Sequence, residues 1–243
     1  MPDPLLTVLT YLAIPALVIA AAGILAAFYS FGPRLRSSFQ HFAAGLVFAA
    51  VSTGLLPEVM KARQFIPTLV GFSVGVVTML VMKWLLERGG HPGFNEEDPP
   101  WTLVATAAVD YLVDGLMIGF GFGIGARAGG LLTIALTAEG LFLAIAVISA
   151  IARHRFPWQR IVLISSGFGL LFTGGAILGS TFYRLLSGPI HTAVLAFGVA
   201  ALSYLVTEEL LVEAHEHRIQ ENPLTASLFF AGFLLIVSLE LSL

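Results

Sequence analysis

The sequence predicts an all-α membrane protein with eight transmembrane helices, and its composition and the glycine and proline residues between its apolar stretches support this prediction. Of the 243 residues, 57% are hydrophobic and only 11% are charged. A soluble domain carries roughly 25% charged residues. Apolar stretches of about 20 residues, the length that crosses a bilayer as a helix, follow one another with short breaks between them. Glycine and proline mark these breaks, as is typical of turns between helices.

The predicted helices form a single transmembrane domain over residues 1–243. No basic segment precedes the first apolar stretch, so we interpret it as a spanning helix and not as a cleaved signal. The breaks fall at Gly32-Pro33, Pro67, Gly89-Gly90, Pro99-Pro100, Gly129-Gly130, Pro157, Gly188-Pro189 and Asn222-Pro223. The helices are expected over residues 5–31, 40–60, 66–87, 101–126, 130–152, 160–184, 190–214 and 224–242.

Composition also limits the function. The chain has no cysteine, which excludes disulfide bonds and thiolate metal sites. No charge-dense domain outside the apolar stretches is evident, so we expect no nucleic-acid partner. We expect a multi-pass protein of the cell membrane that contacts the lipid bilayer and works within its helical bundle.

Basic residues predict the orientation, because cytoplasmic loops carry an excess of lysine and arginine. The connections after the first, third, fifth and seventh helices hold eight basic residues, and the other connections hold four. The first set is therefore predicted to be cytoplasmic, which places both termini outside. The cytoplasmic set is Arg34, Arg36, Lys83, Arg88, Arg153, Arg155, Arg160 and Arg218, and the outer set is Lys61, Arg63, Arg127 and Arg184.

Three acidic residues lie inside apolar stretches. Asp110 and Asp114 are four residues apart, which puts both on one face of a helix, and Glu139 lies in the next stretch. An ionised and unpaired acid in a membrane costs several kcal/mol. Nothing basic lies between Leu103 and Ala126, so a bound cation, a shared proton or a watery cavity must stabilise the acids. All three solutions indicate cation handling.

Other residues extend this candidate site. Met117 follows Asp114 by three residues, where its thioether is either packing or a possible soft ligand. Glu58 is predicted at the outer mouth, where it would attract cations. His41 and the end of the seventh helix are predicted to be cytoplasmic, where acids and histidines either receive a departing cation or form a solvated helix end. The group at that helix end is Glu209, Glu213, His215 and His217.

Glycines crowd the stretch over 101–126. The spacing Gly115-xxx-Gly119 allows two helices to approach closely. We expect this pair to pack against the helix over 130–152.

The sequence also contains a weak internal repeat. The segment Leu55–Val59 resembles Leu210–Ala214, and His41–Val47 aligns with Ala196–Leu202 at the same spacing. The two helices run in opposite directions, so the repeat is inverted, with a 3+2+3 arrangement of helices. Inverted repeats with a site at their interface are typical of transporters. Chance similarity between two apolar segments is the alternative.

The segment His41–Glu58 resembles the second helix of the ZIP (Zrt/Irt-like protein) family of divalent metal transporters. Glu208–His215 resembles the end of that family's seventh helix, and Phe229–Leu235 resembles its last helix. The resemblance implies a ZIP-like fold and the movement of a divalent cation, such as Zn, Mn, Fe or Cd, into the cytoplasm. It also implies no organic cofactor and no enzymatic activity. Family members are commonly dimeric, so a homodimer is possible.

The metal motifs depart from the family pattern. The family's fourth helix carries a His-Asn-x-Pro-Glu-Gly motif, where this chain reads Asp110-Tyr-Leu-Val-Asp-Gly115. The family's fifth helix carries a His-Glu-x-Pro-Glu-Gly motif, where this chain reads Ala135-Leu-Thr-Ala-Glu-Gly140. These departures make the chain a divergent member.

When the family's metal ligands are matched to this chain position by position, the resemblance implies one transport site, formed by Asp110, Asp114 and Glu139. The second site of the family is expected to be lost, because Tyr111 and Leu136 stand in place of its ligands. Three carboxylates without an imidazole form an oxygen site that suits Mn, Mg, Ca or ferrous iron, although zinc also binds carboxylates.

Alternatives to this interpretation exist for the site and for the function. The acids could be protonated and hydrogen-bonded to Thr106, Thr133, Thr137 or Ser165. The protein could be a degenerate relative that no longer transports metal and acts as a sensor, a scaffold or a carrier of another substrate. An intramembrane enzyme is a remote alternative, because the His-Glu-x-x-His and Gly-x-Ser-Gly motifs are absent.

Overall fold

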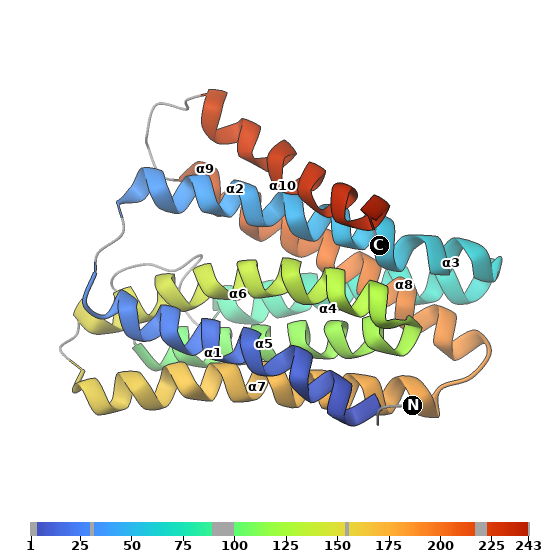
Figure 1. Cartoon of the computed structure of the whole chain (residues 1–243). Coiled ribbons are helices and arrows are strands. Elements are labelled where there is room, and N and C mark those ends of the chain that lie inside the picture. The colour runs from blue at the N-terminus through green and yellow to red at the C-terminus, as the bar shows by residue number, and fades with distance from the viewer. Residues whose placement is uncertain (1–3, 30–31, 89–99, 154–155, 217–222, 243) are drawn as a thin grey trace.

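The computed structural model describes residues 4–29, 32–88, 100–153, 156–216 and 223–242, which form helices joined by short connections (Figure 1). In this part of the chain, seven helices are long and apolar enough to cross a membrane, and Leu12–Ala26 is a shorter apolar helix. The protein is a multi-pass helical membrane protein. Its helices are α1 Pro4–Ala26, α2 Pro33–Ala50, η1 Val51–Leu55, α3 Leu56–Ala62, α4 Phe65–Arg88, α5 Pro100–Ile124, α6 Ala126–Arg153, α7 Trp158–Leu185, α8 Pro189–Tyr204, η2 Leu205–Leu210, α9 Leu211–Glu216 and α10 Pro223–Ser242.

The predicted helices occur in the predicted order, but some boundaries differ. The helix predicted over 40–60 already begins at Pro33, because proline fits the first turn of a helix. The helix predicted over 130–152 begins at Ala126, since the amide of Gly129 donates a helical hydrogen bond to Gly125 at 3.0 Å. The first helix ends at Ala26 and not near residue 31.

Two of the long helices contain a π-helical turn. The chain continues from α2 through η1 into α3, and from α8 through η2 into α9. A π turn adds a residue to the helical hydrogen-bond ladder and occurs frequently at functional sites. The extra residue rotates every side chain that follows, so a helical wheel drawn from the sequence mispredicts which face those side chains occupy.

The helices pack into a bundle in which α1 and α5 each pack against both α6 and α7. Around them, α2 packs against α6 and α10, and α4 packs against α8. Figure 1 shows α7 and α10 at opposite sides of the bundle, with α6 between them. The start of α1 and the end of α10 lie toward the same end of the bundle as α3 (Figure 1).

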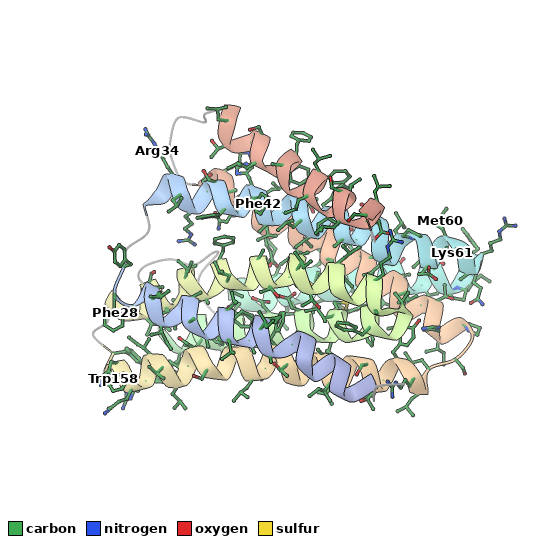
Figure 2. The ribbon with its side chains drawn as sticks, in the orientation of Figure 1. Phe28, Arg34, Phe42, Met60, Lys61 and Trp158 are labelled. Atoms are coloured by element: carbon green, nitrogen blue, oxygen red, sulfur yellow. The ribbon has the colours of Figure 1, made fainter. Side chains whose placement is uncertain are left out.

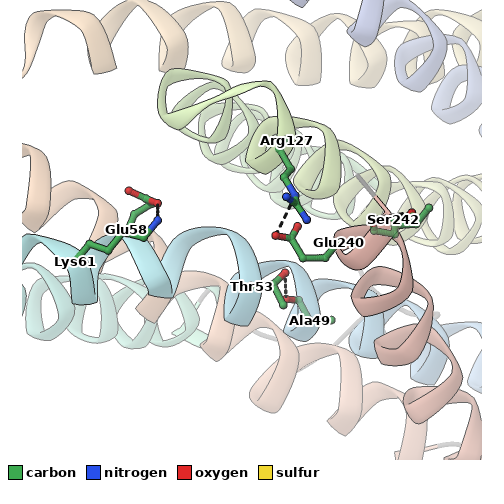
Figure 3. A network of polar contacts seen from close by, with 8 residues as sticks. Ala49, Thr53, Glu58, Lys61, Arg127, Glu240 and Ser242 are labelled. Atoms are coloured by element: carbon green, nitrogen blue, oxygen red, sulfur yellow. Dashed lines mark hydrogen bonds and ion pairs between the residues drawn. The ribbon is translucent and has the colours of Figure 1, made fainter.

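The two ends of the bundle differ in their side chains. Phe28, Arg34 and Trp158 lie at one end, and Met60 and Lys61 lie at the opposite end (Figure 2). We call the end with Phe28, Arg34 and Trp158 the basic end, because the first turn of α2 there carries Arg34 and Arg36. The opposite end holds an ion pair between Arg127 of α6 and Glu240 of α10, with Nε and Oε1 3.0 Å apart (Figure 3).

Glycines bring the backbones of α5 and α7 into close contact. A methyl group added at Gly115 would overlap the carbonyl oxygen of Phe172, and one added at Gly175 would overlap that of Leu112. Gly119 faces the same helix. The prediction that Gly115 and Gly119 pack against the helix over 130–152 was therefore wrong, because their partner is α7 and not α6.

Candidate functional site

The candidate site contains two buried acids from neighbouring helices. Asp114 lies near the middle of α5, and Glu139 lies near the middle of α6. Each has only 4% of its surface exposed. Their carboxyl groups are hydrogen-bonded to each other. Ionised carboxylates only accept hydrogen bonds, so two carboxyl groups can form this bond only when one of them carries a proton.

Two further acids lie next to this pair. Asp110, which is half-buried one turn before Asp114, interacts electrostatically with Glu209 and with Glu139. Glu209 also acts electrostatically on Asp114. We call Asp110, Asp114, Glu139 and Glu209 the acidic cluster. It joins α5 and α6 to η2, three segments that are far apart in the sequence.

Glu209, which the sequence analysis grouped with the cytoplasmic helix end, acts electrostatically on Asp110 and Asp114, and its role at a cation exit stays a prediction. Its neighbour Glu208 faces elsewhere, with its carboxylate 3.4 Å from the ammonium group of Lys83 and 48% of its side chain exposed. Both glutamates belong to η2. Glu209 is half-buried and Glu208 is exposed, and no periodicity in the sequence indicates this difference.

The three predicted ligands do not form a ready-made coordination shell. Within the residues that the structure describes, no three His, Asp or Glu side chains are arranged to hold a metal ion. Asp114 and Glu139 bind each other, and Asp110 lies one turn away on α5. Cation binding at this trio therefore requires loss of the shared proton and movement of Asp110 toward the pair.

Two of the hydroxyl groups that could have stabilised protonated acids donate elsewhere. Thr133 donates to the carbonyl of Gly129 at 2.7 Å, and Thr137 donates to the carbonyl of Thr133. Both bonds lie within α6. These two hydroxyls are therefore not directed at the acids, and the hydrogen-bond partner of Asp114 is Glu139. That the acids bind a cation, and do not form a purely structural network, stays a prediction.

The positions that replace the family's second-site ligands are filled by packed side chains. Tyr111 is fully buried, its hydroxyl donates to the carbonyl of Gly140 at 2.5 Å, and its ring stacks on Phe168 with centroids 4.8 Å apart. Leu136 is fully buried as well. These contacts agree with packing roles for both residues, and the loss of a second metal site remains a prediction.

The remaining predicted ligands have other neighbours. Met117 is buried, and its sulfur packs against Gly198 of α8, so a ligand role for it stays a prediction. Glu58 forms an ion pair with Lys61 at 2.6 Å (Figure 3). This pairing offsets the negative charge that would attract cations at the predicted outer mouth.

The predicted cytoplasmic exit is described only in part. The ring of His215 contacts the ring of His41, which comes from α2. The side chain of Glu213 and the whole of His217 lie outside the described residues. The sequence placed His41 and His215 at the same end of the bundle, but it did not indicate that they touch.

No protein-family model matches the chain, and no curated protein matches it either. The fold and the site define a class of protein: a multi-pass helical membrane protein with a cluster of acids inside its bundle.

Proposed function

We propose that the protein is a transporter that moves divalent metal cations across the membrane through the acidic cluster. The supporting observation is the hydrogen-bonded pair of buried carboxyl groups, Asp114 and Glu139, in the middle of two membrane-spanning helices. Acids at this depth are costly and usually mark ion or proton pathways. The ZIP resemblance of the sequence points to the same function, with transport directed into the cytoplasm.

In this proposal the cation replaces the shared proton. A divalent ion between Asp114 and Glu139 offsets two negative charges, whereas the proton offsets one. Asp110 supplies a further oxygen ligand when it moves toward the pair. Because protons and cations compete for the same carboxylates, the apparent affinity for the cation falls as the pH falls.

The π turns support the proposed inverted repeat. The spacing that relates Leu55 to Leu210 carries η1, Val51–Leu55, onto residues 206–210, and η2 is Leu205–Leu210. The two helices that contain these turns run in opposite directions through the bundle (Figure 1). Irregular helices at matching positions of two inverted halves are a feature of transporter sites.

Uptake by proteoliposomes tests the function. Purified protein is reconstituted into vesicles that contain a metal-sensitive dye, and Zn, Mn, ferrous iron and Cd are supplied outside one at a time. We expect flux of at least one of these cations down its gradient, above that of protein-free vesicles. If none of them enters, metal transport is contradicted. The better hypothesis is then that the protein acts as a sensor, a scaffold or a carrier of another substrate.

Adjacent glutamates in η2 provide a matched pair of variants. Glu209→Gln removes a charge that acts on Asp110, so we expect about a tenfold loss of uptake, which corresponds to roughly 1.4 kcal/mol. Glu208→Gln removes a charge that faces Lys83, and we expect uptake within about twofold of the parent, which corresponds to less than roughly 0.5 kcal/mol. Initial rates at equal protein density measure both. Equal losses in the two variants would argue against a specific role for Glu209.

Selectivity is expected to depend on Asp110. Asp110→His replaces an anionic oxygen ligand with a neutral imidazole, which should shift preference toward zinc over manganese. The measurement is a competition assay in which each metal blocks uptake of the other, at two pH values, in parent and variant. If both proteins rank the metals identically and neither responds to pH, Asp110 does not face the cation.

A further inference from the structure

Two histidines from distant parts of the chain meet where α2 lies beside α9. The rings of His41 and His215 pack edge to face, with their centroids 5.0 Å apart. His41 is buried, whereas His215 is exposed and lines a surface pocket. Next to this contact the hydroxyl of Ser37 donates to the carbonyl of Ala214 at 2.8 Å. This hydrogen bond joins α2 to α9 beside the two rings, and the surface pocket reaches His215 but is not lined by His41.

Both rings direct Nδ1 at a backbone carbonyl of their own helix, which leaves Nε2 as the nitrogen that could bind a metal. Nδ1 of His41 faces the carbonyl oxygen of Ser37 at 2.9 Å, and Nδ1 of His215 faces that of Leu211. A carbonyl oxygen only accepts hydrogen bonds, so each Nδ1 carries the proton and each neutral ring has its lone pair at Nε2. Histidines that bind metals commonly donate their other nitrogen to a backbone carbonyl in this way.

The surroundings of His41 leave this lone pair unused. Its Nε2 atom is buried and has no hydrogen-bond partner among the described residues. Only 5% of the His41 surface is exposed, so bulk water does not solvate the ring freely. A buried polar atom without a partner needs an explanation, and an unfilled ligand position is one.

The separation of the rings is an ordinary distance for an edge-to-face contact, and it is also the distance expected for two imidazoles that share one ion. Zinc–nitrogen bonds of about 2.0–2.1 Å at a tetrahedral angle hold two imidazole centroids about 5 Å apart. The observed separation is 5.0 Å. Imidazole suits zinc and similar transition metals, whereas magnesium and calcium prefer oxygen ligands.

The pair also lies on a continuation of the acidic cluster. Glu209 of η2 and His215 of α9 belong to one continuous helix and are six residues apart, a rise of about 9 Å. Glu209 in turn interacts with Asp110 and Asp114. The acids and then the imidazoles therefore follow one another toward the basic end of the bundle.

We propose that His41 and His215 form a second cation site, in which their Nε2 atoms bind one divalent transition-metal ion such as zinc and water completes its coordination. Binding at this pair is independent of transport. That cations leaving the acidic cluster bind to this pair on their way out rests on the transport function proposed above.

Metal titration of the purified full-length protein in detergent tests this site. Zinc affinity is measured by competition with a chromophoric chelator, and cobalt(II) absorption reports nitrogen ligands. We expect His41→Gln and His215→Gln each to weaken one zinc site by about tenfold or more. His215 is exposed, so its variant keeps the fold even if the variant at buried His41 does not. Asp114→Asn is expected to keep the imidazole site.

His191→Gln is the matched control, because His191 lies on α8 and packs against Tyr183 and not against a second imidazole. Unchanged zinc affinity and an unchanged cobalt spectrum in His215→Gln would overturn the site. An equal loss in His191→Gln would overturn it too, because the metal would then not be specific to the pair. A His215-dependent site in a protein without cation flux supports the site and contradicts only the transport function. Cation flux in a protein without a His215-dependent site supports the transport function and contradicts the imidazole site.

Discussion

Asp114→Ala is expected to abolish divalent cation uptake in proteoliposomes. The substitution removes the buried carboxyl group that is hydrogen-bonded to Glu139 in the middle of the bundle. A cation at that depth then loses one of its compensating charges, which costs about 3 kcal/mol on insertion scales. At about 1.4 kcal/mol per factor of ten, the rate should fall by about a hundredfold.

The isosteric variant Asp114→Asn separates charge from shape. It keeps the size of the side chain and can still hydrogen-bond to Glu139, but it carries no charge. We expect the same loss of uptake as for Asp114→Ala, with an unchanged elution volume in size-exclusion chromatography. Undiminished flux in either folded variant would refute the assignment of Asp114 to the transport site.

Gly175→Ala is expected to destabilise the bundle, although alanine favours a helix more than glycine does. The added methyl group would overlap the carbonyl oxygen of Leu112 and contact Gly115, and both neighbours are backbone that cannot rotate away. Overpacking of this kind typically costs about 1–3 kcal/mol. Because Leu112 and Gly115 flank Asp114, the displacement of α5 should also lower uptake. The midpoint of thermal unfolding in detergent measures the loss of stability.

The neighbouring glycine provides the control. An added methyl group at Gly174 meets nothing within 4 Å, although Gly174 lies in the same helix. Gly174→Ala should therefore leave uptake unchanged and raise stability by up to about 1 kcal/mol, through helix propensity alone. If the two variants unfold at the same temperature, the close contact between α5 and α7 does not limit stability.

Much of the architecture follows from the order of apolar stretches. The predicted helices appear in the predicted order, because burial of backbone polar groups in a membrane leaves helices as the local solution. Gly32-Pro33 and Gly188-Pro189 lie where one helix gives way to the next, whereas the predicted break at Gly129-Gly130 was wrong, because both glycines lie inside α6. Two helix starts moved, at Pro33 and at Gly129, where residues that often end helices fit into a first helical turn, and the first helix ended earlier than predicted, at Ala26.

The candidate site was predictable in part. Asp110, Asp114 and Glu139 stand out because acids inside apolar stretches are rare, and the structure brings the last two into contact. Glu209 could not be distinguished from Glu208, since both are adjacent acids near a helix end. The contact between His41 and His215 was equally hidden, because it depends on how α2 and α9 meet.

By itself, the sequence determined that this is a multi-pass helical membrane protein, and it identified the acids that need compensation inside it. Both results depend on hydropathy and spacing along one helix, which are local properties. The tertiary structure decided that α5 packs on α7, that Glu209 of η2 acts electrostatically on Asp110, and that Asp114 is hydrogen-bonded to Glu139. These contacts join separate helices that are apolar over most of their surface, so no pattern along one helix specifies which helix it meets.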